Sequence, residues 1–468
     1  MPRFPTNFVD DLKAHADILQ VIHDVVPLKK SGSTYKGLCP FHKEKTPSFH
    51  VNPDKGFFHC FGCATGGDVV KFVELYDKLS FPEAVRALAQ RFGMTVPESD
   101  DPEQDRRITI EREALVKLHE IAKDYYCEQL ESKNGTHARE YLDRRELAAP
   151  TIKELDLGVA PPQRDALKQH LLDAGHPLEL LLKSGLVVQR EGGKSVDRFR
   201  NRLMVPICRD TGSVIAFGGR SLTSDQQPKY LNSPETPLYS KGRVLYGLHL
   251  TKKDIRRLGY AVLVEGYFDF AQAFQAGVKT VVATCGTALT QMQSRLLKRS
   301  CTKVLLSFDP DTAGQGASTR SGELLLSEGF QTNVVTLASG EDPDSFVRLH
   351  GANSYRLKLK NSQPYLEYVL DQAIRGRNLS RETDQRDFLA DMLAVAARIP
   401  DPASRDRFAD RLAHRANVME DVIRSEIRKA AIAKRTEIPI EVQVARSELR
   451  QAEKGILWAT IHTVSYTH

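Results

Sequence analysis

Long hydrophobic runs are missing from this sequence. No stretch of about eighteen apolar residues occurs in the 468-residue chain, which excludes a transmembrane helix. The opening residues, MPRFPTNFVDDLKAHADI, contain no apolar stretch of the length that a signal peptide needs. Cysteine is scarce, and an odd total of 7 argues against a disulfide framework and fits a reducing cytosol. We therefore expect a cytoplasmic protein that does not act at a membrane.

An ATPase signature is missing as well. Gly193, Lys194 and Ser195 resemble the end of a P-loop, but Val188 stands where that motif needs its first glycine. The turn therefore cannot cradle phosphates in the way of a P-loop, and an ATP-driven motor is not expected. The chain also has no internal repeat and no low-complexity tract.

The length and the charge distribution are informative. Because 468 residues exceed what one hydrophobic core ordinarily supports, two to four domains are expected. The net charge is only +6, but it is unevenly spread. Residues 198–257 contain twelve Lys and Arg against four Asp and Glu, whereas residues 262–350 contain seven against nine. A basic block beside an acidic one suggests that a polyanion binds near a metal site.

Composition and periodicity divide the chain into six segments. The first reads as a compact unit of short strands and helices, and the second has the acidic, Pro-containing composition of a linker. The third is a mixed α/β segment rich in basic residues. In the fourth, the apolar stretches AVLVE, TVVAT, KVLLSF and NVVTL alternate with helix-length segments, which predicts a parallel sheet. The fifth is helical, and the sixth holds one further helix. The segments are residues 1–96, 97–109, 110–257, 258–350, 351–435 and 436–468.

A metal site is predicted in the first segment. Cys39 and His42 are separated by two residues, and Cys60 and Cys63 repeat this spacing seventeen residues later. Two such turns can direct four sulfur and nitrogen ligands at one point, which suits one Zn²⁺. Four protein ligands leave no open position, so the site should be structural.

Aromatic residues surround the second pair of these ligands. Phe57, Phe58 and Phe61 lie there, together with His59. Bases of a single strand could stack on these rings, or the rings could fill the small core of a ribbon, and the sequence leaves both readings open.

Carboxylates follow the strands of the predicted sheet. Glu265 ends one strand, and Asp309 and Asp311 follow another. Asp342 and Asp344 come after a third strand. Ligands of an open α/β sheet bind at the carboxyl ends of its strands, and clustered carboxylates select Mg²⁺ or Mn²⁺. Acids at strand ends also serve as helix N-caps, and Asp344 fits that alternative.

The acidic stretches resemble a known family. EGYFD (265–269), FDPDTAG (308–314) and EDPDSF (341–346) are similar to the three acidic motifs of a Toprim domain. Together with the Cys-His-Cys-Cys ribbon, the stretches RFRNRLMVPI (198–207), AFGGR (216–220) and KYLNSPETPLYSKGRVLYGL (229–248) resemble the bacterial DnaG-type DNA primases. The resemblance covers roughly residues 1–435.

The resemblance implies a multidomain α/β fold. It comprises an N-terminal zinc ribbon, a linker, the basic part of a polymerase core, a Toprim (Rossmann-like) parallel sheet and a helical C-terminal segment. The implied activity is synthesis of short RNA primers on single-stranded DNA during replication, by two-metal nucleotidyl transfer from ribonucleoside triphosphates.

The resemblance also implies roles for single residues. Glu265, Asp309 and Asp311 would hold the catalytic metals, while Asp269, Asp342 and Asp344 are secondary candidates that bind the other metal or orient the first ligands. The expected nucleic-acid- and nucleotide-binding residues are Arg145, Arg198, Arg202, Arg220, Lys229, Tyr230, Asn232 and Lys241. A solvated basic face is the alternative for this basic set.

Two other functions stay open, and so do the partners. A Toprim topoisomerase would need an active-site tyrosine on a separate domain, and a zinc-ribbon protein with an inactive Toprim fold would only bind DNA. The resemblance implies a monomer, at the nucleoid of a bacterial cytoplasm, that works with a replicative helicase. Because residues 436–468 look like the remnant of a helicase-binding domain, helicase binding is expected to be weak or lost.

Overall fold

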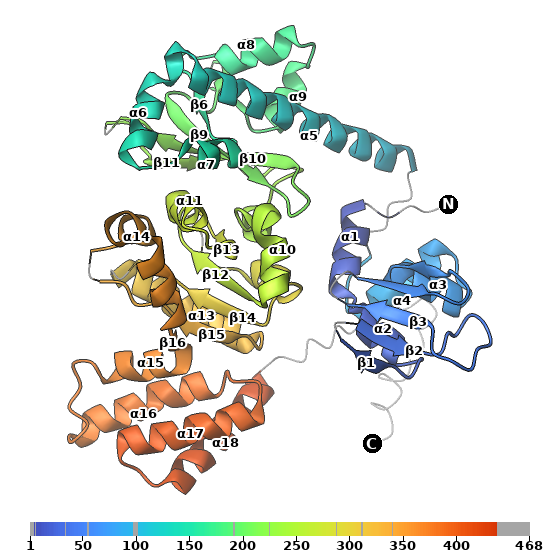
Figure 1. The fold of residues 1–468 in the computed structure, drawn as a ribbon, viewed down its shortest axis with the longest axis vertical. Coiled ribbons are helices and arrows are strands. Elements are labelled where there is room, and N and C mark those ends of the chain that lie inside the picture. The colour runs from blue at the N-terminus through green and yellow to red at the C-terminus, as the bar shows by residue number, and fades with distance from the viewer. Residues whose placement is uncertain are drawn as a thin grey trace, which may run out of the picture. The chain divides into compact units, whose positions relative to one another are not determined.

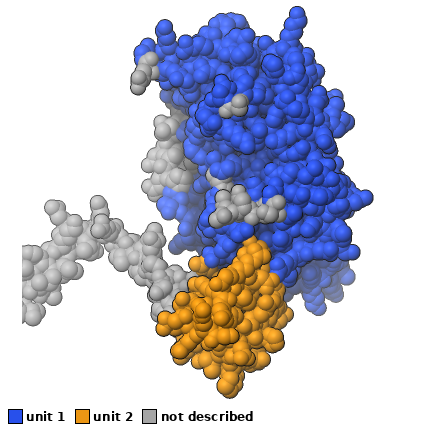
Figure 2. Space-filling view, turned by 90° about the vertical axis from the view of Figure 1, so that its left-hand side faces the viewer, with its two compact units in different colours: residues 1–365 blue, residues 366–468 orange. Residues whose placement is uncertain are grey.

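The computed structural model describes most of the chain. The chain divides into two compact units, Met1–Tyr365 and Leu366–His468 (Figure 2). Within the described part, no helix has the length and apolar character that crossing a membrane requires. The described residues are 4, 6–32, 34–53, 56–96, 102–190, 192–223, 225–286, 288–309, 312–338 and 340–437.

The first part of the larger unit is a five-stranded antiparallel sheet with strands in chain order, shown in blue in Figure 1. In the third strand, the buried Phe49 and Val51 alternate with His50 and Asn52, which are only partly buried, as the two-residue repeat of a strand requires. Phe49 packs on Phe58 with ring centroids 5.4 Å apart. The elements are α1 (Thr6–His15), α2 (Ile18–His23), β1 (Lys29–Ser31), β2 (Thr34–Gly37), β3 (Phe49–Asn52), β4 (Phe57–Cys60), β5 (Gly66–Gly67), α3 (Val69–Tyr76) and α4 (Phe81–Arg91).

A mixed α/β part follows. Its long first helix, α5 (Pro102–Glu131), takes up residues that the composition assigned to the linker 97–109. Proline and acidic residues are also favoured in the first turn of a helix, so the same composition fits both structures. Of the predicted linker, residues 97–101 lie outside the described part of the chain. The part continues with η1 (Lys133–Gly135), α6 (Thr136–Arg144), α7 (Ala149–Glu154), β6 (Gly158–Ala160), α8 (Ala166–Asp173), α9 (Leu178–Lys183), β7 (Val187–Gln189), β8 (Ser195–Asp197), β9 (Arg202–Cys208), β10 (Val214–Ser221), β11 (Tyr230–Asn232), η2 (Lys241–Arg243) and α10 (Leu248–Leu258).

The sheet of this part is antiparallel, in the order β11-β10-β9-β6. Strand β9 is buried along its whole length, between β10 and β6. Strand β11 forms one edge of this sheet and pairs with β10.

The predicted parallel sheet is present. Its order is β13-β12-β14-β15-β16, and only β16 runs antiparallel. The first strand of this sheet, β12, lies between β13 and β14. The strand order therefore runs in one direction from β12 to β13 and in the other from β12 to β14. This is the switch point at which ligands of open α/β sheets bind. The elements are β12 (Tyr260–Val264), α11 (Tyr267–Gln275), β13 (Val281–Ala283), α12 (Gln291–Lys298), β14 (Lys303–Leu306), α13 (Thr312–Ser327), β15 (Gln331–Val334), α14 (Pro343–Lys360) and β16 (Gln363–Pro364).

The second unit is helical. The predicted helical segment began at residue 351, whereas the structure keeps α14 and β16 with the parallel sheet and begins the second unit at Leu366. Helical periodicity alone does not show which core a helix joins. The helices of this region bury Phe388, Leu412 and Ile423 among others. They are α15 (Tyr365–Ile374), α16 (Glu382–Ala396), α17 (Pro402–Ala416) and α18 (Glu420–Glu437). The predicted helix at 445–460 lies outside the described residues.

Candidate zinc site and active site

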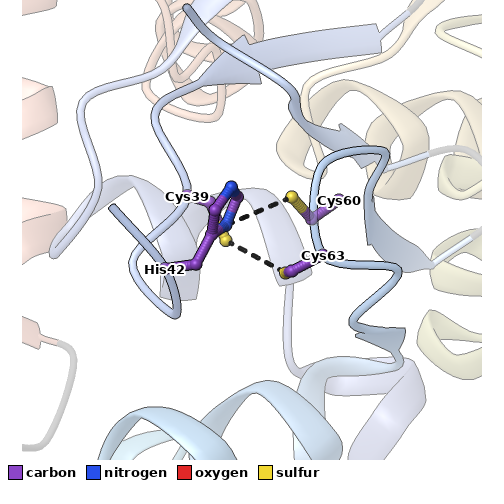
Figure 3. Close-up of side chains that lie close together, drawn as sticks. All are labelled: Cys39, His42, Cys60 and Cys63. Carbon is purple, nitrogen blue, oxygen red and sulfur yellow. Dashed lines mark hydrogen bonds between the residues drawn. The ribbon is translucent and has the colours of Figure 1, made fainter. Parts of the chain in front are cut away.

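The four predicted zinc ligands lie together. Sγ of Cys39 is 3.8 Å from Sγ of Cys63, and Nδ1 of His42 is 3.8 Å from Sγ of Cys60 (Figure 3). The ligand atoms all lie within 4.8 Å of one another. Atoms bound at about 2.3 Å to a tetrahedral zinc are roughly 3.8 Å apart, so the cluster fits one zinc ion.

Backbone donors prepare this cluster for a cation. Burial alone would raise the pKa of Cys60, but hydrogen bonds from Ser48 and from the backbone N–H groups of Cys63 and Gly62 lower it to about 7. Burial raises the pKa of Cys39 to about 12. A zinc ion favours the thiolate of every cysteine ligand.

Glu44 supports the cluster and was not predicted from the sequence. Its carboxylate lies 3.3 Å from Nε2 of His42, and it accepts hydrogen bonds from the backbone N–H groups of Cys39, at 2.7 Å, and Ser48, at 3.1 Å. A carboxylate on the free nitrogen of a ligating histidine fixes the ring and strengthens the ligand. The signal was its position two residues after His42.

The aromatic residues near the zinc ligands separate into two groups. Phe58 is buried in the ribbon core, whereas Phe57 and Phe61 are 39% and 73% exposed. His50 and His59 each contact Phe61 edge-on, with ring centroids 5.1 Å and 4.7 Å away. One predicted reading therefore holds for Phe58, and the other stays open for Phe57 and Phe61.

The predicted acidic and basic residues meet at the carboxyl edge of the parallel sheet. A cavity of about 510 Å³ is lined there by Glu265, Asp269, Asp309, Asp342 and Asp344. Because β12 and β14 are paired in parallel, Glu265 and Asp309 leave the sheet at neighbouring positions. Six of the predicted binding residues line the same cavity: Arg145, Arg220, Lys229, Tyr230, Asn232 and Lys241.

Three of the acids form a metal-sized group. Ligand oxygens of Asp269, Asp309 and Asp342 lie within 4.8 Å of one another. Burial, reinforced by the negative charges of Asp342 and Asp309, raises the pKa of Asp269 to about 8. Hard oxygen donors in this arrangement fit a divalent cation, which would relieve the repulsion. Asp311, predicted as a metal ligand, lies outside the described residues.

Asp344 has a different environment. Its side chain is 1% exposed and forms ion pairs with Arg145 and, at 3.3 Å, with Arg348. Its backbone N–H donates to Asp269 Oδ1 at 3.3 Å. The N-cap of α14 is Asp342, not Asp344, because Asp342 Oδ1 accepts the Ser345 N–H at 2.7 Å.

Arg198 and Arg202 do not line the cavity. Arg198 donates to the backbone carbonyl of Asn232 at 3.2 and 2.9 Å. Arg202 is buried, and its guanidinium donates to the carbonyls of Gly219, at 3.1 Å, and Pro228, at 2.9 Å. Both arginines thus fasten the segment around β11.

Asn232 lines the cavity, but protein groups occupy both ends of its amide. Oδ1 accepts from the hydroxyl of Tyr267 at 2.9 Å, and Nδ2 donates to the carbonyl of Cys285 at 3.2 Å. The Cys285 N–H in turn donates to the carbonyl of Glu265 at 2.9 Å. Cys285 has a φ of 52°, a left-handed conformation that these contacts hold beside the carboxylates.

Aromatic rings pack against the guanidinium groups of Arg145 and Arg220, the two arginines that line the cavity. Sequence reasoning did not predict these contacts. The guanidinium carbon of Arg220 lies 4.7 Å from the ring centroid of Tyr141 and 5.2 Å from that of Tyr230. That of Arg145 lies 5.0 Å from Phe268. Phe268 falls inside the EGYFD stretch, which was the available signal. The rings hold the arginine planes by cation–π contact.

Comparison with known proteins gives these sites a family. The description "CHC2 zinc finger" matches residues 4–104, "DNA primase catalytic core, N-terminal domain" matches 125–252, and "Toprim-like" matches 262–347. A DNA primase of Halalkalibacterium halodurans is 38% identical over 429 residues, 91% of this chain and 71% of the relative. The chain belongs to the DNA primase family. A Pseudomonas putida DNA primase is 41% identical, over 87% of this chain and 63% of its own length.

Solved primase structures resemble the fold. The zinc-binding and RNA polymerase domains of the Aquifex aeolicus primase are 35% identical and match with a TM-score of 0.59, covering 89% of this chain and 98% of that one. The DnaG primase catalytic domain bound to ssDNA is 31% identical with a TM-score of 0.61, covering 67% of this chain and 99% of that one. The predicted ribbon, α/β core and parallel sheet are therefore confirmed as those of a primase.

The comparison adds a helicase-binding domain that the sequence reading did not place. The description "DnaB-helicase binding domain of primase" matches residues 366–421, in the second unit. A helicase-binding domain is therefore present before residue 436, whereas the expectation that residues 436–468 are the remnant of such a domain stays a prediction. The sequence reading treated 351–435 as a generic helical segment, because an amphipathic repeat does not reveal which partner a bundle binds.

Proposed function

We propose that the chain makes short RNA primers on single-stranded DNA, with the cavity at the sheet edge as its polymerase site. The carrying observation is that a group of carboxylates and a set of cations from a different part of the chain line one cavity. The acids suit divalent metals, and the cations suit the phosphates of a template or a ribonucleoside triphosphate. Positioning and electrostatics provide most of the rate in such a transfer.

Magnesium is the proposed ion, with manganese as its substitute. Glu265, Asp309, Asp311 and Asp342 would hold it, and Asp269 would orient the others through its hydrogen bond to the Gly266 N–H, at 2.9 Å. When bound, such ions lower the pKa of an attacking hydroxyl and neutralise the phosphates. Buried between two arginines, Asp344 would position Arg145 and not bind the metal.

The cavity cations divide by role. Lys229 is exposed beside the cavity, and Lys241 reaches the Gly286 carbonyl at 3.3 Å, so both can meet phosphate. Arg145 and Arg220 present guanidinium planes to phosphate oxygens, and Tyr230 offers a partly exposed ring for a base. Asn232, Arg198 and Arg202 support these residues from behind.

Template binding by the zinc ribbon is a second part of the proposal. The exposed Phe57 and Phe61 offer ring faces on which bases can stack, and Lys36 of β2, which is paired with His50 of β3, can meet phosphate. A zinc ion would hold the turn between Cys60 and Cys63 that carries Phe61. The solved structure of a DnaG primase catalytic domain bound to ssDNA supports single-stranded DNA as the ligand of the catalytic core.

The second unit would bind the replicative helicase. Its family match and two exposed apolar residues, Met419 and Val422, support this. Primer yield should rise when the cognate helicase is added and should not rise for Met419→Asp. Equal stimulation of both forms would mean that the helicase contacts a surface other than that around Met419. No stimulation of the parent protein would support the prediction from the sequence that helicase binding is weak or lost. The monomeric state and the nucleoid location stay predictions, to be tested by sedimentation and by imaging.

A synthesis assay tests the central proposal. Single-stranded template, four ribonucleoside triphosphates and Mg²⁺ should give short RNA whose sequence is complementary to the template. DNA binding without synthesis would favour the non-catalytic alternative. Cleaved DNA covalently attached to a tyrosine would favour a topoisomerase.

A further inference from the structure

Two glutamines stand behind the active-site cations. Gln272 of α11 and Gln293 of α12 are 1% and 0% exposed, although neither lines the cavity. The side-chain amide of Gln272 donates to the backbone carbonyl of Arg145. That of Gln293 donates to the carbonyls of Lys241, at 3.2 Å, and Val244, at 2.8 Å. Each glutamine thus holds the main chain of one cavity cation.

The backbone carbonyl that Gln272 contacts lies at the end of a helix. Arg145 is the C-cap of α6, where the last carbonyls have no intrahelical donor. Gln275, one turn after Gln272, extends the contact by donating to the Glu146 carbonyl at 2.9 Å and accepting the Ala148 N–H at 2.7 Å. Three hydrogen bonds from two glutamines therefore fix the turn that presents Arg145.

Lys241 is held in the same manner. It lies in the single 3₁₀ turn η2, which has too few internal hydrogen bonds to be rigid by itself. Besides the two bonds from Gln293, Thr290 donates its hydroxyl to the carbonyl of Gly242. Gln293 Oε1 accepts the Thr290 N–H at 3.0 Å as part of a capping box.

An ordinary role in the core does not account for this pairing. A buried amide needs some hydrogen-bond partner, and its own helix or sheet could supply one. The side-chain N–H groups of both glutamines instead reach from helices of the parallel sheet to main chain that precedes the sheet. Each glutamine contacts the backbone carbonyl of a residue whose cationic side chain lines the cavity, Arg145 or Lys241. Neither of these backbone segments carries a carboxylate that lines the cavity.

We propose that Gln272 and Gln293 are positioning residues that set the affinity of the active site for the triphosphate, acting through Arg145 and Lys241. The inference rests on the proposed function of these two cations. The carboxylates that bind metal are held by other contacts, so the glutamines should change KM for the nucleotide and leave kcat nearly unchanged.

The test is a double-mutant cycle on primer synthesis. Gln272→Met keeps the size of the side chain but removes the donor, and KM for ribonucleoside triphosphate should rise roughly tenfold, which corresponds to about 1.4 kcal/mol. Arg145→Ala should raise KM by itself. Because the backbone carbonyl of residue 145 remains, Gln272→Met should add little to KM in the Arg145→Ala background while still lowering Tm. Gln293→Met with Lys241→Ala forms a second cycle.

Two further variants control for damage to the fold. Gln385→Met removes the same kind of bond, from Gln385 Nε2 to the Ala416 carbonyl at 2.7 Å in the second unit, and should leave KM unchanged. Gln275→Met loosens the Arg145 turn from a less buried position and should raise KM roughly threefold even if Gln272→Met does not fold.

The outcomes are distinguishable. A parent-like KM in Gln272→Met, or an effect that adds fully to that of Arg145→Ala, would overturn the positioning role and leave the proposed function intact. A parent-like KM in Arg145→Ala would overturn both the phosphate role of that arginine and the inference built on it.

Discussion

One ligand of the zinc cluster and one acid of the carboxylate cavity have pKa values shifted in opposite directions. In the ribbon, hydrogen bonds from Ser48 and from backbone N–H groups lower the pKa of Cys60 to about 7, which favours its thiolate over that of an ordinary cysteine. In the cavity, burial and neighbouring acids raise the pKa of Asp269 to about 8, so this acid keeps its proton until a cation is bound. In both sites a bound cation would favour the anionic form of these groups.

The two sites also differ in how the chain assembles them. The zinc ligands all fall within residues 39–63, on two turns of one small sheet. The cavity draws on residues from Arg145 to Asp344, from an antiparallel sheet and a parallel one. Damage to the first site should therefore be local and structural, whereas damage to the second should be chemical. The predictions below test this difference.

The largest effect is expected for Asp309→Ala. Loss of this carboxylate removes a metal ligand at the reacting phosphates, so primer synthesis should fall by roughly a thousandfold or more. Affinity for single-stranded DNA should stay equal or rise, because a negative charge near the phosphates is gone. Gel assays of RNA product and fluorescence anisotropy of labelled DNA measure the two. Near-parent synthesis would reduce Asp309 to an ordinary strand-end acid.

Loss of zinc should unfold the ribbon and spare the rest. The protein should contain about one zinc ion per chain, and Cys60→Ser or a strong chelator should remove it. Hydrogen exchange should then increase across the first hundred residues, while the parallel sheet keeps its protection. A metal-free ribbon with parent protection would contradict the structural role of zinc.

The sequence predicted the zinc site more completely than the cavity, and the reason is physical. Ligand spacing alone identifies Cys39, His42, Cys60 and Cys63, since short turns fix where their atoms lie. Strand-end position identifies Glu265 and Asp309, but not that Asp344 is buried between arginines. Arg202 reads as a phosphate ligand in sequence, yet it is buried against backbone carbonyls. Long-range packing decides such cases, and local pattern carries no record of it.

Glu44→Gln should weaken zinc binding without changing the ligand set. The carboxylate orients His42 and strengthens it as a ligand, so affinity should drop roughly 10- to 100-fold. Competition with a chromogenic chelator measures this. Ser48→Ala, which removes a hydroxyl that contacts both Glu44 and Cys60, is the comparison, and its effect should be smaller. Unchanged affinity in Glu44→Gln would confine that residue to holding the backbone of the turn.

Stability of the polymerase core should fall as pH rises when no divalent ion is present. The folded protein holds a proton on Asp269 up to about pH 8, whereas the unfolded chain releases it near pH 4, so the folded state binds more protons between these values. The stabilisation is complete below the unfolded pKa and is lost as pH passes about 8. As pH rises in the presence of chelator, the Tm of the parent protein should drop by several degrees more than the Tm of Asp269→Asn. Mg²⁺ should reduce this difference. Equal pH profiles would mean that Asp269 is ionised in the metal-free cavity.

The smallest effects are expected from the exposed lysines at the cavity, and they separate a binding surface from a merely basic one. Lys229 lies exposed at the cavity rim, and Lys241 reaches the Gly286 carbonyl beside the carboxylates. If each contacts one phosphate of a single strand, Lys229→Ala or Lys241→Ala should reduce the slope of log affinity against log salt by roughly 0.7. Anisotropy titrations over a range of salt give this slope. Lys253→Ala, on α10 and not among the residues that line the cavity, provides a matched loss of one exposed positive charge and should leave the slope unchanged. If all three variants shift the slope equally, the strand follows the general charge of the surface, and the cavity would owe its affinity to the metal ions instead.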